Sequence, residues 1–166
     1  MPILSDNKGR VFPPRVYPST QIAWNVGLFT VKATICDDDD NGPPDVRNEG
    51  FWPSLDPQDA GYIGPKSPRA LKAAQRRAQA IHEGWKNNAW FYVGVEVNVF
   101  LKDAQLTDNF THALWGIEAN YPTRKGKNPN AYLTEVAYDL AKDALDDAEE
   151  KLVMITEMWA KAHDKT

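Results

Sequence analysis

Residues 91–101 carry the clearest structural pattern in the chain, a regular alternation of two sets of side chains. One set is entirely apolar: Phe91, Val93, Val95, Val97, Val99 and Leu101. A period of two predicts a β-strand with one buried face, because successive side chains of a strand point to opposite faces of the sheet. Ala113, Trp115 and Ile117 repeat the alternation after a polar connection, which is typical of an antiparallel hairpin. We therefore expect two paired strands with Val97 and Trp115 in the core.

An earlier segment, residues 21–36, shows the same period with a change of phase. Ile22, Trp24, Val26 and Leu28 share one parity, and from Phe29 onward the apolar residues occupy the other parity. Gly27 lies at the change. This arrangement favours a β-bulge or a strand buried on both faces. We expect one long strand with an irregularity near Gly27.

Two segments have helical spacing instead. Ser67-Pro68 is a strong helix start, with an N-cap serine and proline at the first helical position. The apolar stripe that follows contains Leu71, Ala74, Ala78, Ile81 and Trp85. A final helix after residue 130 is predicted to bury Leu133, Ala137, Leu140, Ala144, Ala148, Leu152, Ile155 and Trp159.

The order strand, long loop, helix, strand, strand, helix predicts an α+β fold, with an antiparallel sheet and helices on one face. An alternative keeps the first strand outside the sheet as a separate flap. We expect an extended N-terminal arm over residues 1–20 and a single domain over 21–166. Residues 37–66 are rich in proline and glycine, and a loop of this length is usually functional or disordered.

Composition narrows the class of protein. With 166 residues, 42% hydrophobic and 25% charged, the chain can form one globular core. The single cysteine, Cys36, excludes an internal disulfide framework and favours a reducing compartment. No apolar run approaches the length needed to cross a bilayer. We expect a soluble intracellular protein.

The net charge of −4 is strongly segregated along the chain. Residues 66–87 contain six basic residues against one acid, and the loop 120–130 adds Arg124, Lys125 and Lys127. Residues 37–59 contain eight acids against one arginine, and residues 131–166 contain nine acids against four lysines. Such asymmetry affects association with partners more than it affects the fold.

The basic side chains offer one functional hypothesis. Arg69, Lys72 and Arg76 lie opposite the apolar stripe of their helix, and with the loop residues Arg124, Lys125 and Lys127 they could contact phosphates. Helix, strands and helix with a basic loop loosely resemble the double-stranded-RNA-binding arrangement, although the basic helix start is missing before Tyr132. The alternative function is therefore a nucleic-acid-binding accessory protein.

The acidic side chains offer another hypothesis. Asp139, Asp143, Asp146 and Glu150 follow one face of the final helix at i, i+4, i+7 and i+11. This acidic ridge could imitate a phosphate backbone and occupy a surface on another protein, or it could be a solubilising face. A second candidate for partner binding is the loop, with Asp37, Asp38, Asp39, Asp40, Phe51 and Trp52.

Catalytic patterns are weak. Asp37, Asp39, Asn41 and Gly42 match the first half of a calcium loop, but the twelfth position is Asn48 instead of glutamate, so a solvated acidic turn is favoured. Cys36 has no activating base nearby in sequence. Glu96 and Glu118 lie on neighbouring predicted strands and could approach each other as an acid–base pair, but solvated strand residues are favoured. We expect no catalytic residues, no metal and no cofactor.

Three segments carry a resemblance: the strand WFYVGVEVNV, the strand ALWGIE and the acidic helix start YLTEVAYDLAKDALDDA. Over residues 85–150 the chain resembles a family of small proteins encoded by tailed bacteriophages and prophages. The resemblance implies a phage-derived accessory protein and provides no catalytic residues. By analogy, such a protein binds and modulates a host protein complex, and a CRISPR or restriction system is one candidate target. This non-enzymatic role is our leading hypothesis.

Overall fold

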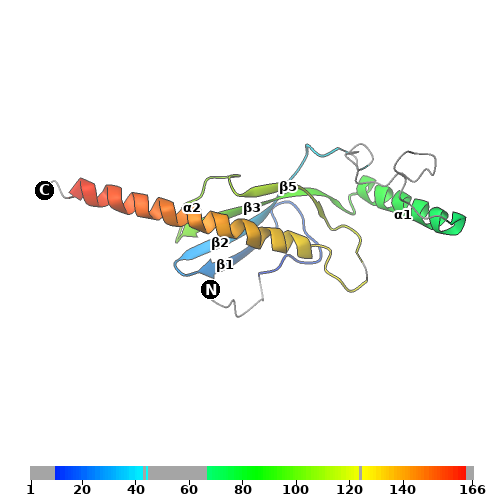
Figure 1. Ribbon diagram of the computed structural model, residues 1–166, viewed down its shortest axis with the longest axis horizontal. Helices are drawn as coiled ribbons and strands as arrows, with labels where there is room; N and C mark the ends of the chain where they lie inside the picture. The colour runs from blue at the N-terminus through cyan, green and yellow to red at the C-terminus, as the bar shows by residue number, and fades with distance from the viewer. Residues whose placement is uncertain (1–9, 43, 45–66, 124, 164–166) are drawn as a thin grey trace.

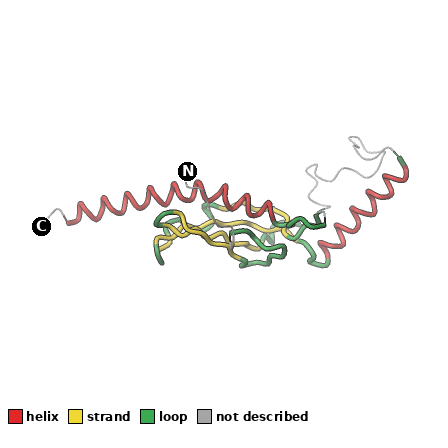
Figure 2. Tube along the Cα trace, turned by 90° about the horizontal axis from the view of Figure 1, so that it is seen from below, coloured by secondary structure: helices red, strands yellow, loops and turns green. Residues whose placement is uncertain are grey.

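The computed structural model describes residues 10–42, 44, 67–123 and 125–163 (Figure 1). Its elements are β1 (Gln21–Val26), β2 (Phe29–Asp37), α1 (Pro68–Lys86), β3 (Phe91–Leu101), β4 (Ala104–Gln105), β5 (Ala113–Ala119) and α2 (Ala131–His163). The five strands form one antiparallel sheet in which β2 lies between β1 and β3, while β4 and β5 both pair with the other edge of β3. The predicted α+β fold with an antiparallel sheet is confirmed. Only α2 packs on the sheet, and α1 projects from one end of it (Figures 1 and 2).

The segment predicted as one long strand is a tight hairpin. Val26 pairs with Phe29, so Gly27 and Leu28 form a two-residue turn between β1 and β2. Gly27 has a φ of 57°, and two-residue hairpin turns require a positive φ at this position. The change of phase therefore marks a reversal of the chain and not a bulge. Because β2 pairs with β3 along its whole length, the alternative of a separate flap is also wrong.

The core lies between the sheet and α2. Val93, Val95, Val97 and Val99 of β3 are 0% exposed on the face that α2 covers, which confirms the prediction for Val97. Leu133, Ala137, Ala144 and Ala148 of α2 are likewise completely buried. Full burial of each valine side chain contributes about 1.5–3 kcal/mol.

A bulge in β5 places Trp115 outside this core. Val93 pairs with Ile117, and Val95 pairs with Leu114. The interval from Leu114 to Ile117 on β5 is therefore one residue longer than the interval from Val93 to Val95 on β3. Gly116, with a φ of 78°, supplies the left-handed conformation within the bulge. The extra residue reverses the parity, and Trp115 lies over Gly94 on the face away from α2. Trp115 is 43% exposed, so its predicted place in the core was wrong.

Residues 10–20 belong to the segment that was expected to be an extended arm, and they contribute two residues to the core. Phe12 and Val16 are 0% exposed. Asn120 holds the backbone of Val16 by two hydrogen bonds, accepting from its N–H at 2.9 Å and donating to its carbonyl at 2.9 Å. The side-chain amide of Asn130 donates to the carbonyl of Pro13 at 2.8 Å. These bonds satisfy backbone groups that would otherwise be buried without partners.

Helix α1 begins where the sequence predicted, but it is less buried than its apolar stripe predicted. Ser67 caps the helix by accepting from the N–H of Ala70, and Pro68 is the first helical residue. No residue of α1 is buried, however, and its apolar stripe is only half covered. The indole of Trp90 donates to the carbonyl of Ile81 at 2.7 Å and so ties the end of α1 to the start of β3.

The last part of α2 extends beyond the sheet (Figures 1 and 2). Leu140 and Leu152 still pack partly against the core. Ile155 and Trp159 continue the same stripe but are 52% and 64% exposed, so their predicted burial was wrong. We call residues 153–163 the overhang, which amounts to about 16 Å of helix.

Candidate functional site: the outer face of α2

All four carboxylates of the acidic ridge are exposed on the side of α2 that faces away from the sheet. Asp139 forms an ion pair with Lys142, with its carboxylate 2.7 Å from Nζ. Hydrogen bonding to Asp139, together with its negative charge, raises the pKa of Lys142. Asp143, Asp146 and Glu150 form no ion pair with any residue that the structure describes. Three carboxylates of the ridge therefore face solvent without an ion pair to a described residue.

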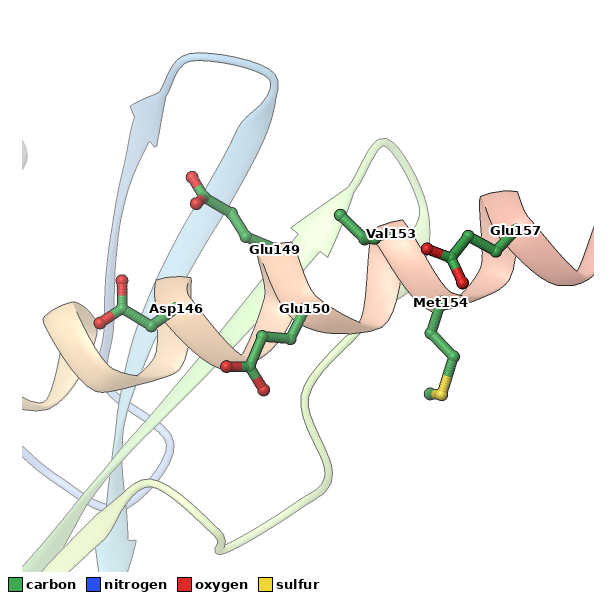
Figure 3. A pocket seen from close by; sticks show the side chains of 6 residues that line it. All are labelled: Asp146, Glu149, Glu150, Val153, Met154 and Glu157. Atoms are coloured by element: carbon green, nitrogen blue, oxygen red, sulfur yellow. The ribbon is translucent and has the colours of Figure 1, made fainter.

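The overhang adds large apolar side chains to the same helix. Five of them are more than half exposed: Val153, Met154, Ile155, Met158 and Trp159. Val153 and Met154 lie beside the ridge, and they line a shallow groove of about 560 Å³ (Figure 3). The groove is completed by Asp146, Glu149, Glu150 and Glu157. Val153 and Met154 therefore add apolar contacts beside the carboxylates, a mixture that protein interfaces use.

A second acidic surface lies where β2 ends. The carboxylate of Asp38 accepts from the N–H of Gly116 at 2.7 Å and from the side-chain amide of Asn41, which fixes the aspartate turn against the bulge of β5. The turn and the bulge line a cleft of about 560 Å³ formed by Asp37, Asp38, Asp39, Asp40, Asn41, Trp115 and Gly116. Phe51 and Trp52, which the sequence placed in the same candidate site, lie outside the described residues.

The contribution of Trp115 to this cleft was missed from the sequence. The available signal was the glycine that follows it, because a glycine inside a strand often marks a bulge. An adjacent cleft of about 400 Å³ includes Trp85, Phe91 and Tyr92 beside the same aspartates. Carboxylates next to aromatic rings suit a basic side chain of a partner.

The aspartate turn lacks the arrangement of a calcium loop in the part that the structure describes. No three side chains from Asp, Glu, His and Cys come together there as a metal site. The inward-pointing carboxylate belongs to Asp38, which is not at a ligand position of the calcium pattern. Asn48 and Glu49 lie outside the described residues.

Cys36 and Glu96 lie side by side on the face of the sheet away from α2, with Sγ 3.6 Å from Oε2. Burial, and then the charge of Glu96, raise the pKa of the Cys36 thiol to about 11. Glu96 also accepts from the N–H of Phe110 at 2.8 Å. Glu118 pairs with Tyr92, four residues along β3 from Glu96, a separation of about 13 Å. The two glutamates therefore do not form the acid–base pair that the sequence allowed.

The histidines are on three separate elements. The imidazole of His112 is 3.3 Å from the carboxylate of Asp147 and connects the start of β5 to α2. His82 stacks on Trp85 in α1, and His163 bonds to the carbonyl of Trp159 at the end of α2. Each therefore has a structural contact of its own.

The basic candidates lie apart from the acidic ridge. Arg69, Lys72 and Arg76 are all exposed on α1, and Lys125 and Lys127 are exposed in the connection that leads to α2. Arg124 lies outside the described residues. None of Arg69, Lys72 and Arg76 forms an ion pair within the described ranges.

Comparison of the chain with protein-family models, with curated proteins and with solved structures yields no match. Within the described residues, neither α1 nor α2 has the length and apolar character required to span a bilayer.

Proposed function

We propose that this protein is a non-enzymatic binding protein that docks the outer face of α2 on another protein and modulates it. The observation that carries the proposal is the combination of the acidic ridge with exposed apolar side chains on the overhang of the same helix. A partner that fits this face presents basic side chains around an apolar patch. Exposed carboxylates accelerate the encounter with such a surface, and the apolar contact slows dissociation.

The resemblance to phage and prophage proteins supports a host protein complex in the bacterial cytoplasm as the partner. Defence complexes that bind nucleic acid are the first candidates, because their basic surfaces normally hold phosphates and would accept a ridge of carboxylates. The aspartate turn with Trp115 is a second contact region for the same partner.

The protonation state of the Cys36 thiol supports a non-enzymatic role. The pKa of Cys36 is raised to about 11, so its thiol is protonated near neutral pH and reacts slowly. The neighbouring carboxylate of Glu96 accepts a backbone hydrogen bond and is 8% exposed, which leaves it little access to a substrate.

The proposal is tested by capturing partners from a bacterial host lysate and then measuring the affinity of the purified partner. Asp139→Asn, Asp143→Asn, Asp146→Asn and Glu150→Gln together should leave the fold intact and weaken binding by about tenfold or more, since charge pairs at interfaces contribute more than 1.4 kcal/mol in favourable cases. Binding of the wild type should also weaken as salt rises, because the Debye length falls to about 3 Å at 1 M.

A matched control removes four exposed carboxylates elsewhere: Glu83→Gln, Asp103→Asn, Asp108→Asn and Glu118→Gln. This variant has the same net charge as the ridge variant and should bind like the wild type. If both variants bind with wild-type affinity, the ridge is only a solvated helix face and the proposal is wrong.

A second candidate, nucleic-acid binding, is favoured by one observation: the basic face of α1 projects from the sheet without ion pairs to described residues. Under this hypothesis the wild type binds duplex or single-stranded nucleic acid with a steep salt dependence, and Arg69→Ala, Lys72→Ala and Arg76→Ala together abolish binding. We expect no binding by the wild type at physiological salt in an electrophoretic shift assay. Tight binding there would reverse the order of the two candidates.

A further inference from the structure

The groove on the outer face of α2 offers a basic helix both carboxylates and apolar contacts. Val153 and Met154, 59% and 55% exposed, form its apolar centre, and Glu150 and Glu157 lie on either side of them along the helix (Figure 3). These two glutamates are seven residues apart, which is two helical turns or about 10.5 Å. Glu157 also approaches Lys161 at 3.9 Å, an exposed pair that binds weakly. Along its length, the face therefore presents acid, apolar surface and acid.

The exposed face of α1 carries the complementary charge. Arg69 and Arg76 are also seven residues apart, and Lys72 and Ala73 lie between them on the exposed side of the helix. The long aliphatic stems of arginine and lysine can cover apolar surface while their charged ends reach carboxylates. The basic face of α1 thus matches both the apolar centre and the acidic ends of the groove.

The two helices of one chain do not meet, because α1 projects from one end of the sheet and the overhang of α2 from the other (Figures 1 and 2). Two chains that lie side by side in opposite directions bring each α1 next to the α2 of the other chain. A two-fold axis then forms both contacts at once.

We propose that the partner seated in this groove is a second copy of the chain, with α1 of one protomer in the α2 groove of its partner. The inference rests on the proposed function, since it assigns a partner to the same face of α2. A host protein with a basic surface would compete with α1 for the groove. Self-association should be strongest at low salt, because exposed opposite charges drive it.

A charge swap tests this pairing in the full-length chain. The groove variant carries Asp146→Lys, Glu150→Lys and Glu157→Lys, and the helix variant carries Arg69→Glu, Lys72→Glu and Arg76→Glu. Sedimentation velocity at low salt should show a dimer for the wild type and a monomer for each variant, with self-association weakened at least about tenfold by like charges. An equimolar mixture of the two variants should form a dimer again, and so should a chain carrying all six changes.

A control chain with Asp103→Lys, Asp108→Lys and Glu118→Lys has the same net charge as the groove variant and should remain a dimer like the wild type. Circular dichroism of each variant checks that it is folded. The inference is overturned by a wild type that stays monomeric up to about millimolar concentration, which places the dissociation constant of the dimer above about 1 mM. It is equally overturned by a mixture of variants that stays monomeric, or by growth to open-ended assemblies.

Failure of this inference differs from failure of the proposed function. If the wild type is monomeric but still binds a purified host partner through the ridge, only the proposal of a second copy in the groove is wrong. If the wild type dimerises through the groove but binds no other protein through α2, the proposed dimer stands and the proposed modulation of a host protein is wrong.

Discussion

The two parts of α2 have the same apolar periodicity and opposite surroundings. Leu133, Ala137, Ala144 and Ala148 are 0% exposed on the sheet, whereas Met158 and Trp159 are both 64% exposed on the overhang. The sizes of the side chains differ in the same way. The packed part uses alanine at most of its buried positions, and the overhang uses long and aromatic residues.

This difference has a physical cause. The distance between packed elements depends on the side chains at their contact, and alanine lets a helix lie close to a sheet. A stripe of large apolar residues without a sheet beneath it exposes surface that is favourable to bury, and so it supports docking of another chain. The comparison teaches that periodicity identifies which face of a helix is apolar, while the surrounding fold decides whether that face is buried or stays exposed.

The largest expected effect comes from the packed part of α2. Leu133→Ala should lower the free energy of unfolding by about 2–5 kcal/mol, because it leaves a cavity at a fully buried position. Trp159→Ala on the overhang should change it by less than about 0.5 kcal/mol in the monomer. Urea denaturation of the two variants measures both values. Equal losses would contradict the division of α2 into a packed and a projecting part.

The bulge in β5 provides the same comparison for a strand, because Trp115 and Ile117 share a parity in the sequence but lie on opposite faces. A Cβ on Gly94 would be 2.4 Å from Cε3 of Trp115, so Gly94→Ala should destabilise the protein by about 1–3 kcal/mol. Gly42→Ala is the matched control, since no atom of the described part of the chain lies within 4 Å of its Cβ position.

Combining Gly94→Ala with Trp115→Ala should cost less than the sum of the single changes, because removal of the indole also removes the clash. Thermal denaturation of the three variants completes the cycle. Strict additivity would mean that Trp115 does not cover Gly94.

A smaller effect is expected from removal of the overhang. Truncation after Leu152 should change the stability of the monomer by less than about 1 kcal/mol, since the lost apolar residues are mostly in solvent. Truncation after Lys142, which also removes buried Ala144 and Ala148, should unfold the protein. Denaturation in high salt, where self-association is weakest, measures the difference. A large loss from the shorter truncation would show that the overhang packs on its own sheet.

The smallest effect is expected at the ridge. Asp139→Asn should leave the stability almost unchanged at neutral pH, since both partners of its ion pair are exposed and solvent screens them. The pKa of Lys142 is raised in the folded protein, so the contribution of the pair is complete below the ordinary lysine pKa of 10.5 and disappears as Lys142 loses its proton at higher pH. In Asp139→Asn the pKa of Lys142 should return toward 10.5, as an NMR titration of its side chain can measure. An unchanged pKa would exclude Asp139 as the cause.

Much of the architecture follows from local pattern alone. The alternation over residues 91–101, the Ser67-Pro68 start of α1 and the long stripe of α2 predicted the main strand, both helices and the α+β class. The exposure of the acidic ridge and of the basic face of α1 was also predictable, because charged residues opposite an apolar stripe remain in water. These features depend on neighbours only a few residues apart.

Only the tertiary structure decided the rest, because it depends on residues far apart in the chain. Gly27 becomes a hairpin turn once β1 pairs with β2, and Gly116 becomes a bulge once Trp115 packs over Gly94. Asp38 meets the bulge across 78 positions, and the amides of Asn120 and Asn130 bind backbone more than 100 positions away. The periodicity of α2 fixed an apolar face along the whole helix. The length of the sheet beneath it determined where burial stops and exposed apolar surface begins.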